Sequence, residues 1–388
     1  MKLLVTDGGA RAALAITRSL GDAGHTVYVS APKRHSIAAL SRRCAGEFLQ
    51  PGGTASPHEI ADSIAASASQ CDADRVVGVI DRTLTALHLA TPGLGATLLP
   101  HPRAEQYVCA SDKAWLFERC REWSIDVPDG ERVPGGELPN REILERLGRD
   151  WVLRPALSWR WADGRWVQGR VQAVSGWDAL VDAIKLDAAY DHPYLVQKRI
   201  RGEACGLFLC ARAGRIEALF SHQRVREKPP WGGVSTLCRS VRPPLDLVRV
   251  AERFVAEQSW SGLAMLEFKR DASDGRPYLL EINARPWGSM ALSRAAGVDF
   301  ARAWLTPEDF DHVPGEYRDG VQLRWWWGDV DHYYLLEKEN GATGATAMLR
   351  GFSRACVAGP WAEAWDTFRW DDPLPFAAET LAWWAHEG

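Results

Sequence analysis

The first hundred residues alternate between short apolar runs and longer stretches with helical periodicity. Residues 2–6 and 25–30 are apolar runs typical of buried strands, and residues 10–23 between them fit a helix closed by glycine. Residues 75–80 form another such run, followed by a helix-like stretch to about residue 90. This order predicts a βαβ start and a Rossmann-like parallel α/β domain over residues 1–102.

Strand and helix patterns of mixed order follow to about residue 305. Strands are predicted at residues 151–155, 165–167, 193–200, 205–211, 215–220, 263–269 and 277–283, and helices at 106–123, 177–186, 246–258 and up to 296 after a loop at 285–289. The tail beyond residue 305 is polar and contains three consecutive tryptophans at 325–327, which suits a cap or an interface. An α+β architecture is therefore expected after the first domain.

The last predicted hairpin carries paired acids. If its turn at residues 271–275 centres near Asp274, Glu267 and Glu281 lie opposite each other, and Asn283 points to the same face. Facing like charges destabilise a ladder by up to about 1 kcal/mol, and a divalent cation between them would turn that repulsion into coordination. Two carboxylates and an amide oxygen suit Mg²⁺ shared with a nucleotide. The alternative is a solvent-facing hairpin whose acids lie near Lys269, Arg270 and Arg276.

Composition and charge narrow the function classes. The net charge of −4 gives no support to nucleic-acid or membrane-surface binding, and no apolar run approaches the length of a membrane span. The N-terminal strand meets a turn too early for a signal peptide, and the eight cysteines contain no CxxC pair, so we expect a cytoplasmic protein with reduced thiols. Gly8 and Gly9 lack the GxGxxG spacing, which gives NAD binding little support.

Two compositional biases affect how single residues are interpreted. Only eight of the 46 basic residues are lysines, so each lysine is more informative than usual. Most of the 19 tryptophans lie in two clusters, between residues 151 and 177 and between 325 and 384. Core packing, a partner surface and a pocket lining are all open for these clusters, with core as the default.

The order of motifs resembles the ATP-grasp superfamily, and more closely its carboxylate–amine ligase branch. The motifs are Lys113 within Ser111–Lys113, the segment Gln197–Glu203, and an E…ExNxR arrangement formed by Glu267, Glu281, Asn283 and Arg285. The resemblance implies an ATP-grasp fold with a pre-ATP-grasp domain over residues 1–102 and two subdomains over 103–190 and 191–305 that clamp ATP. Residues 306–388 are then a tryptophan-rich C-terminal extension.

The resemblance also implies roles for individual residues. Glu267, Glu281 and Asn283 match the magnesium ligands, and Arg285 matches an arginine that contacts phosphate and the tetrahedral intermediate. Lys113 matches a nucleotide lysine. The hinge residues Gln197, Lys198 and Ile200 are expected at adenine, and Glu203 is expected at the ribose hydroxyls.

One departure concerns the phosphate-binding region. The family normally has lysine before the proline of the 151–155 strand, and here Arg154 takes that place, a planar fork rather than a point charge. The following loop, residues 156–161, lacks the family's glycines, which let backbone N–H groups approach phosphates. Compensating contacts are expected from Ser158, Arg160 and Arg165.

The segment from Ser221 to Ser235 resembles the substrate segment of the ligase branch. Arg224 or Arg226 is expected to bind a substrate carboxylate, with Ser235 nearby. His222 is expected to orient substrate or accept a proton from the amine, and a structural histidine is at least as well supported. Trp287 is expected to floor the acceptor pocket, with core packing as the competing role.

The function expected from these residues is an ADP-forming, ATP- and magnesium-dependent ligase that makes an amide through an acyl phosphate. Mn²⁺ is an alternative metal, and the substrates are small molecules, a carboxylic acid (an amino acid or specialised metabolite) and an amine. Two alternatives remain open: an ATP-grasp enzyme that uses bicarbonate or carbamate chemistry, and a degenerate module that binds nucleotide without turnover. No nucleic-acid or membrane partner is expected, and a homodimer is compatible with the sequence.

Overall fold

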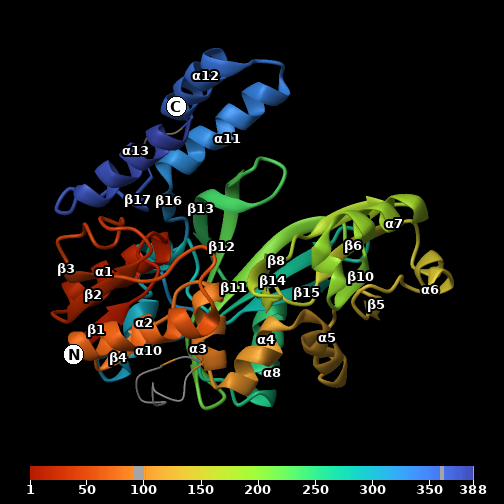
Figure 1. The fold of residues 1–388 in the computed structure, drawn as a ribbon, viewed down its shortest axis with the longest axis horizontal. Coiled ribbons are helices and arrows are strands. Elements are labelled where there is room, and N and C mark those ends of the chain that lie inside the picture. The colour runs from red at the N-terminus through yellow and green to blue at the C-terminus, as the bar shows by residue number, and fades with distance from the viewer. Residues whose placement is uncertain (91–99, 101, 359–361, 388) are drawn as a thin grey trace.

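Three β-sheets and a small hairpin organise the chain (Figure 1). The computed structural model describes residues 1–90, 100, 102–358 and 362–387. A parallel sheet lies at the left of Figure 1, a second four-stranded sheet at the right, and a seven-stranded sheet between them. The helices of the C-terminal tail lie at the top of this view. The predicted end of the first domain includes residue 101, which lies outside the described residues.

The N-terminal sheet is parallel, with strand order β3-β2-β1-β4, and confirms the predicted βαβ start. Its elements are β1 (Lys2–Val5), α1 (Arg11–Asp22), β2 (Thr26–Ala31), β3 (Cys44–Leu49), α2 (Pro57–Gln70), β4 (Arg75–Val77) and α3 (Asp81–Ala90). The sequence reading missed β3 and α2. The buried carboxylate of Asp7, just after β1, accepts hydrogen bonds from the backbone N–H groups of Val79 and Ile80 and from the Thr83 hydroxyl. These bonds fix the start of α3, and with it Asp81.

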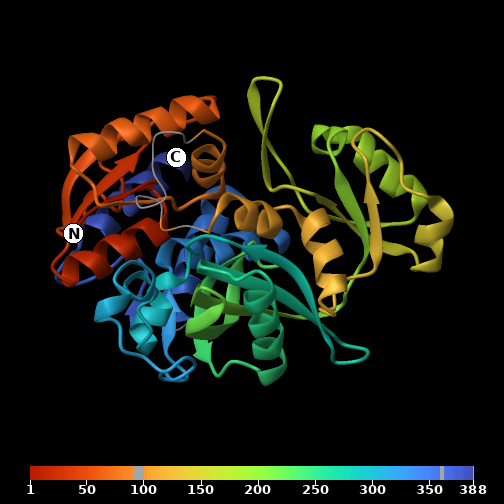
Figure 2. The same ribbon diagram turned by 90° about the horizontal axis from the view of Figure 1, so that it is seen from below.

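The second sheet is antiparallel, with strand order β5-β10-β6-β9. Its elements are β5 (Gly130–Val133), α6 (Arg141–Arg146), β6 (Asp150–Pro155), β9 (Gln172–Ser175), α7 (Trp177–Leu186), η1 (Ala188–Asp191) and β10 (Tyr194–Lys198). Residues 165–167 form a strand as predicted, and β8 (Arg165–Gln168) pairs with β7 (Trp159–Ala162) in a hairpin separate from this sheet. Figure 2 shows the β7–β8 hairpin standing between this lobe and the N-terminal domain.

The helix predicted from residue 106 to residue 123 is two helices, α4 (Ala104–Ser111) and α5 (Lys113–Glu122). Asp112 separates them and caps α5, because its side chain accepts hydrogen bonds from the N–H groups of Ala114 and Trp115. Lys113 is therefore the first residue of a helix rather than a mid-helix residue.

The large sheet has the order β15-β14-β11-β12-β13-β16-β17. Its elements are β11 (Gly202–Arg212), β12 (Arg215–Lys228), β13 (Val234–Val241), α8 (Leu245–Glu257), β14 (Gly262–Asp271), β15 (Pro277–Asn283), α9 (Met290–Ala296), α10 (Phe300–Leu305), η2 (Pro307–Asp309), β16 (Gln322–Arg324) and β17 (Ala364–Trp365). Alternate residues of β11 enter different cores: Phe208 packs with α1, α9 and α10, whereas Leu207 and Leu209 pack with α5 and α8. The large sheet thus joins the N-terminal domain on one face and the second lobe on the other.

The C-terminal tail contributes β16 to the large sheet, forms α11 (Trp326–Glu339) and α12 (Gly344–Val357), returns to the sheet as β17 and ends in α13 (Leu374–Glu387). Trp327 of α11 is buried and stacks on Trp383 of α13 with ring centroids 4.3 Å apart. Core packing therefore explains part of the second tryptophan cluster.

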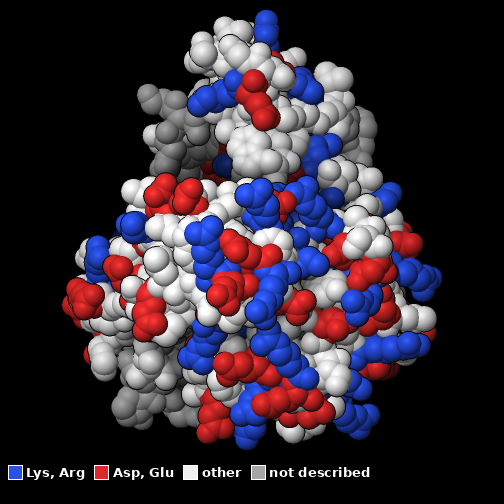
Figure 3. Space-filling view, turned by 90° about the vertical axis from the view of Figure 1, so that its right-hand side faces the viewer, with Lys and Arg blue, Asp and Glu red and all other residues white. Residues whose placement is uncertain are grey.

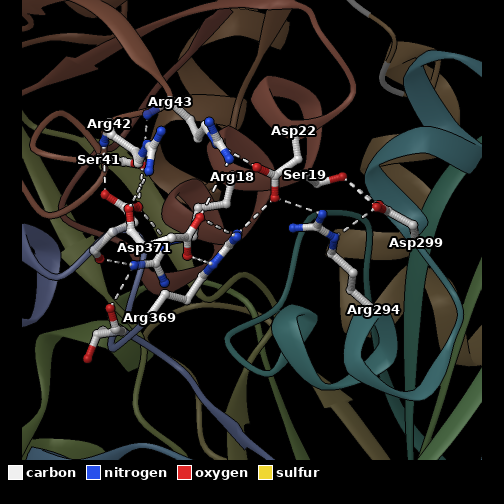
Figure 4. Close-up of polar contacts among 12 residues, drawn as sticks. Arg18, Ser19, Asp22, Ser41, Arg42, Arg43, Arg294, Asp299, Arg369 and Asp371 are labelled. Atoms are coloured by element: carbon white, nitrogen blue, oxygen red, sulfur yellow. Dashed lines mark hydrogen bonds and ion pairs between the residues drawn. The ribbon is translucent and has the colours of Figure 1, made fainter.

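Ion pairs tie the tail to the N-terminal domain and to α9 (Figure 4). The Asp22 carboxylate receives Arg43 at 2.5 Å, Arg369 at 2.8 Å and Arg294 at 2.9 Å. Although burial opposes ionisation, Arg369 and Arg294 lower the pKa of Asp22 to about 2. The tail is thereby fixed beside α1.

Charges of both signs are interspersed over the face shown in Figure 3, in keeping with the net charge of −4. In the part of the chain that the structure describes, no helix is long and apolar enough to span a membrane. All eight cysteines are free thiols.

Candidate functional site

Glu267 and Glu281 lie directly opposite each other on β14 and β15, as the sequence predicts. The outer part of the hairpin pairs Lys269 with Tyr278, and this register continued inward would put Leu280 opposite Glu267. A β-bulge leaves Leu280 as an extra residue and moves Glu281 into that position. The facing pair therefore depends on one extra residue in β15.

Arg154 reaches this bulge from β6 of the second sheet. One of its terminal nitrogens, Nη1, donates to the Leu280 carbonyl at 2.7 Å, and the other, Nη2, donates to Glu281 Oε2 at 2.8 Å. A planar guanidinium serves two acceptors at once, which a lysine ammonium does with less fixed geometry. The bulge therefore gives a structural reason for arginine where the resemblance implies lysine.

The two glutamates have opposite pKa shifts. Burial and the facing Glu281 charge raise the pKa of Glu267, although Arg224 lies close to it. Burial also disfavours ionised Glu281, but Lys113 and Arg154 outweigh it and lower the pKa of Glu281 to about 2. Both side chains keep some access to solvent, with 27% exposure for Glu267 and 24% for Glu281. Both carboxylates are thus accessible to a ligand from solvent.

Cations from distant segments surround the pair. Besides Arg154, Lys113 Nζ lies 3.8 Å from Glu281 and Arg224 Nη2 lies 3.3 Å from Glu267. Lys113 also donates to the Ser158 hydroxyl at 3.0 Å, and burial lowers the pKa of its ammonium. Residues from α5, β6 and β12 therefore converge on one hairpin, and their positive charge suits a polyphosphate.

Arg285 pairs with an acid that the sequence reading did not single out. Its Nε lies 2.8 Å from Asp81 Oδ1, and its Nη2 donates to Asn283 Oδ1 at 3.3 Å. Asp81 comes directly after the predicted strand 75–80, at the carboxyl end of a parallel sheet where functional residues gather. Its position at the end of a predicted strand is the sequence signal that could have identified Asp81. This ion pair connects the N-terminal domain to the candidate site.

Glu267, Glu281 and Asn283 fit a shared magnesium ion. The Asn283 amide nitrogen, Nδ2, donates to Glu281 Oε1 at 3.2 Å and to Glu267 Oε1 at 3.4 Å, while Asn283 Oδ1 accepts from Arg285. The side-chain amide would have to turn over to present its oxygen to a metal held by the two carboxylates. Within the described ranges, no group of three or more His, Cys, Asp or Glu side chains is placed to hold a metal by itself. A hard ion with two carboxylates and an amide needs further oxygens, which nucleotide phosphates and water supply.

The predicted adenine hinge lies at the end of β10. Gln197 is buried and donates to the Pro128 carbonyl at 3.3 Å, and the Lys198 backbone N–H donates to Asp129. The Ile200 carbonyl lies 3.4 Å from the Lys269 ammonium. Glu203 is exposed on β11, three residues before Gly206, and strand alternation puts it on the face away from Glu267. Adenine and ribose binding by these residues stays a prediction.

His222 and Arg224 lie on β12 beside the glutamates. His222 and Glu267 both pair with Gly206 of β11, and the His222 ring lies 3.2 Å from the Ser289 hydroxyl. Burial, followed by the Arg224 charge, lowers the pKa of His222 to about 3. So weak a base does not suit the expected role as a proton acceptor. A positioning role for His222 stays a prediction.

Three other expected substrate residues are engaged elsewhere. Arg226 forms a two-pronged ion pair with buried Asp329 of α11, at 2.6 and 2.7 Å. Ser235 donates to the Leu237 carbonyl of its own strand at 3.1 Å. Trp287 is only 2% exposed and packs between Phe208 and Phe300, so core packing is its role here. Of the substrate residues predicted, the structure brings only Arg224 to the glutamate pair.

Two cavities differ in their relation to this site. A cavity of about 300 Å³ includes Glu281, Asn283, Lys113 and Asp81 in its wall. A larger one, of about 1010 Å³, lies among α1, α9 and the tail, where its arginines Arg18, Arg294 and Arg369 are paired with aspartates. The smaller cavity is the one that adjoins the candidate metal ligands.

Comparisons with known proteins agree with this fold. Residues 192–325 match a family model described as ATP-grasp in the biosynthetic pathway with Ter operon. Among curated protein sequences, none matches the chain significantly.

Several solved structures share the fold. The L-amino acid ligase from Bacillus licheniformis aligns with a TM-score of 0.61 and 14% identity over 83% of this chain and 78% of that one. The N5-carboxyaminoimidazole synthetase from Staphylococcus aureus, solved with ADP, aligns with a TM-score of 0.63 and 12% identity over 88% and 86%. An ADP complex of N5-carboxyaminoimidazole ribonucleotide synthetase aligns with a TM-score of 0.62 and 14% identity over 100% and 97%. The predicted resemblance is thus confirmed, and the chain has the fold of the ATP-grasp superfamily.

Proposed function

We propose that this protein is an ATP- and magnesium-dependent ligase that joins a carboxylic acid to an amine. The observation that carries the proposal is the Glu267–Glu281 pair, ringed by Lys113, Arg154 and Arg224 and adjoined by Arg285. Paired carboxylates beside several cations suit a metal–triphosphate complex, because the carboxylates would bind the metal and the cations would bind the phosphates.

The reaction would run in two transfers. A substrate carboxylate oxygen attacks the γ-phosphorus of ATP, the bond to the β-phosphate oxygen breaks, and ADP leaves. The amine nitrogen then attacks the acyl carbon, phosphate leaves, and the amine loses a proton to give the amide. Glu267, Glu281 and Asn283 would hold Mg²⁺ or Mn²⁺, which neutralises charge on the phosphates.

The cations would act on the charge that moves during these transfers. Arg154 and Lys113, now on Glu281, would turn to the phosphates when nucleotide arrives and leave the carboxylate free for the metal. Arg285, oriented by Asp81, would stabilise negative charge on the transferred phosphoryl group and on the tetrahedral intermediate. Preorganised donors of this kind contribute about 3–4 kcal/mol each to catalysis.

A phosphate-release screen of carboxylic acids against amines, with ATP and Mg²⁺, tests the proposal. At least one pair should release phosphate and ADP in equal amounts, only when both substrates are present. The Glu281→Ala variant should release no ADP, and normal turnover by that variant would rule out the metal assignment.

A second candidate reaction uses bicarbonate, since N5-carboxyaminoimidazole synthetase is among the similar structures. ADP release that depends on bicarbonate and an amine, without an organic acid, would favour it. The third candidate is nucleotide binding without turnover, which the glycine-poor β7–β8 hairpin and Arg154 support. Calorimetric ATP binding with no ADP release for any substrate pair would favour that one.

A further inference from the structure

The cavity beside the metal ligands has aromatic walls. Its lining includes Trp159 and Trp161 from β7, His88 from α3 and Tyr107 from α4. The rings of His88 and Tyr107 are stacked, with centroids 4.2 Å apart and an angle of 22° between them. Pockets for small ligands are typically about 300 Å³ or more, so this one, of about 300 Å³, suits a small ring system.

The β7–β8 hairpin is held against the N-terminal domain. Trp166 of β8 donates from Nε1 to the Ala55 carbonyl at 2.7 Å and packs against the core that contains Leu4 and Ile60. The rings of Trp159 and Trp161 lie edge-on to Trp166, at 6.4 and 5.4 Å. Trp166 thereby positions both rings at the cavity, and the hairpin takes the place of a glycine-rich phosphate loop.

The charged groups that remain available at the cavity are cations. Glu281 is paired with Arg154, Asp81 with Arg285, and the Asp112 side chain caps α5. By contrast, no carboxylate in the described part of the chain lies within ion-pair distance of Arg160, which also lines the cavity. Lys113, at the same end as the metal ligands, carries a second positive charge; it shares Glu281 with Arg154, at 3.8 Å, and donates to Ser158. The cavity therefore combines flat apolar walls with an anion-binding end.

On the basis of the proposed ligase function, we propose that the carboxylic acid activated by this protein carries a flat aromatic ring, bound between the tryptophans of β7 and the His88–Tyr107 stack. The carboxylate would face Lys113 and the metal ligands, where the γ-phosphate must lie for its transfer. The ring would fill the opposite, aromatic end.

Calorimetry with saturating Mg²⁺ and a non-hydrolysable ATP analogue tests this without turnover. The probes are phenylacetate and indole-3-acetate, with cyclohexylacetate as a non-planar acid of similar size and benzylamine as an aromatic amine. At least one aromatic acid should bind roughly fivefold to tenfold more tightly than cyclohexylacetate, because aromatic stacking adds to simple burial. Trp161→Leu and Trp159→Leu should each remove most of this preference, whereas Trp370→Leu, at a tryptophan that is 90% exposed, should retain it.

Each contrary result has a definite meaning. Equal binding of cyclohexylacetate, tighter binding of benzylamine, binding of neither acid, or an aromatic preference that survives in both folded tryptophan variants would overturn the proposal. Turnover of aliphatic and aromatic acids with equal kcat/KM would refute the ring site and leave the ligase function intact. A selective aromatic site in a protein that never releases ADP would refute the ligase function instead.

Discussion

Arg154 is the position where the chain departs from the lysine that the ATP-grasp resemblance implies, and its replacement tests the reasoning about the phosphate site. In Arg154→Met the bonds to Leu280 and Glu281, at 2.7 and 2.8 Å, are lost, and Lys113 remains as the nearest cation to Glu281. A hydrogen bond to a charged group contributes about 1.5–3 kcal/mol to stability, and partial exposure of Glu281 places this one at the lower end. The free energy of unfolding should therefore fall by about 1–2 kcal/mol.

The same replacement should weaken nucleotide binding more than it weakens folding. Loss of one charge-assisted phosphate contact of about 2 kcal/mol raises Kd roughly 30-fold. Arg154→Lys keeps the positive charge but not the planar guanidinium, so its Kd for the nucleotide should rise less than that of Arg154→Met. Calorimetry with Mg²⁺ and a non-hydrolysable ATP analogue measures the binding, and urea unfolding measures stability. Arg212→Met, at a half-exposed arginine of the large sheet that pairs with Glu217, is the control. Wild-type nucleotide affinity in folded Arg154→Met would refute the reasoning.

Three further predictions concern other parts of the site. Burial lowers the pKa of His222 to about 3, so between about pH 6.5 and 3 the unfolded chain binds one more proton than the folded chain. In this range the free energy of unfolding decreases as the pH is lowered, by up to about 1.4 kcal/mol per pH unit. His222→Gln should reduce this slope in urea unfolding at pH 5 and 7; an unchanged slope would contradict the assigned pKa. Asp81→Asn should lower kcat at least tenfold with little change in ATP affinity, since Arg285 loses its orienting charge; an unchanged kcat would contradict this. Arg226→Met should lower the free energy of unfolding by about 1.5–3 kcal/mol, because buried Asp329 loses the hydrogen bonds from Arg226 but keeps its ion pair with Arg324; a stability loss below about 1 kcal/mol would contradict the structural role.

The strand patterns predicted much of the fold because apolar runs and turn residues are local signals. The hairpin of β14 and β15, the helices α1, α7 and α8, and the facing of Glu267 and Glu281 all follow from them. The facing register came out correctly because a turn centred at Asp274 gives the same pairing as the observed turn plus a bulge at Leu280. The sequence does not distinguish these two routes, because a bulge has no local signature at leucine.

The misplaced features depend on contacts between distant segments. The strand at Arg165 was predicted, but its docking was not: Trp166 of β8 bonds to the N-terminal domain, a contact that no local pattern reports. Arg226 resembles a substrate residue by position, yet it is taken by Asp329 from a helix a hundred residues away. Asp81 was overlooked for a similar reason, since its partner Arg285 lies in a different domain.

The central claim is that the glutamate pair holds the metal of a nucleotide site, and Mn²⁺ binding measures it directly. Electron paramagnetic resonance can follow Mn²⁺ titrated into the protein with a non-hydrolysable ATP analogue. Glu267→Gln and Glu281→Gln should each raise the Kd for Mn²⁺ at least tenfold, whereas Glu217→Gln, at an acid paired with Arg212 away from the site, should not change it. Equal Mn²⁺ affinity in the wild-type protein and all three variants would contradict the claim.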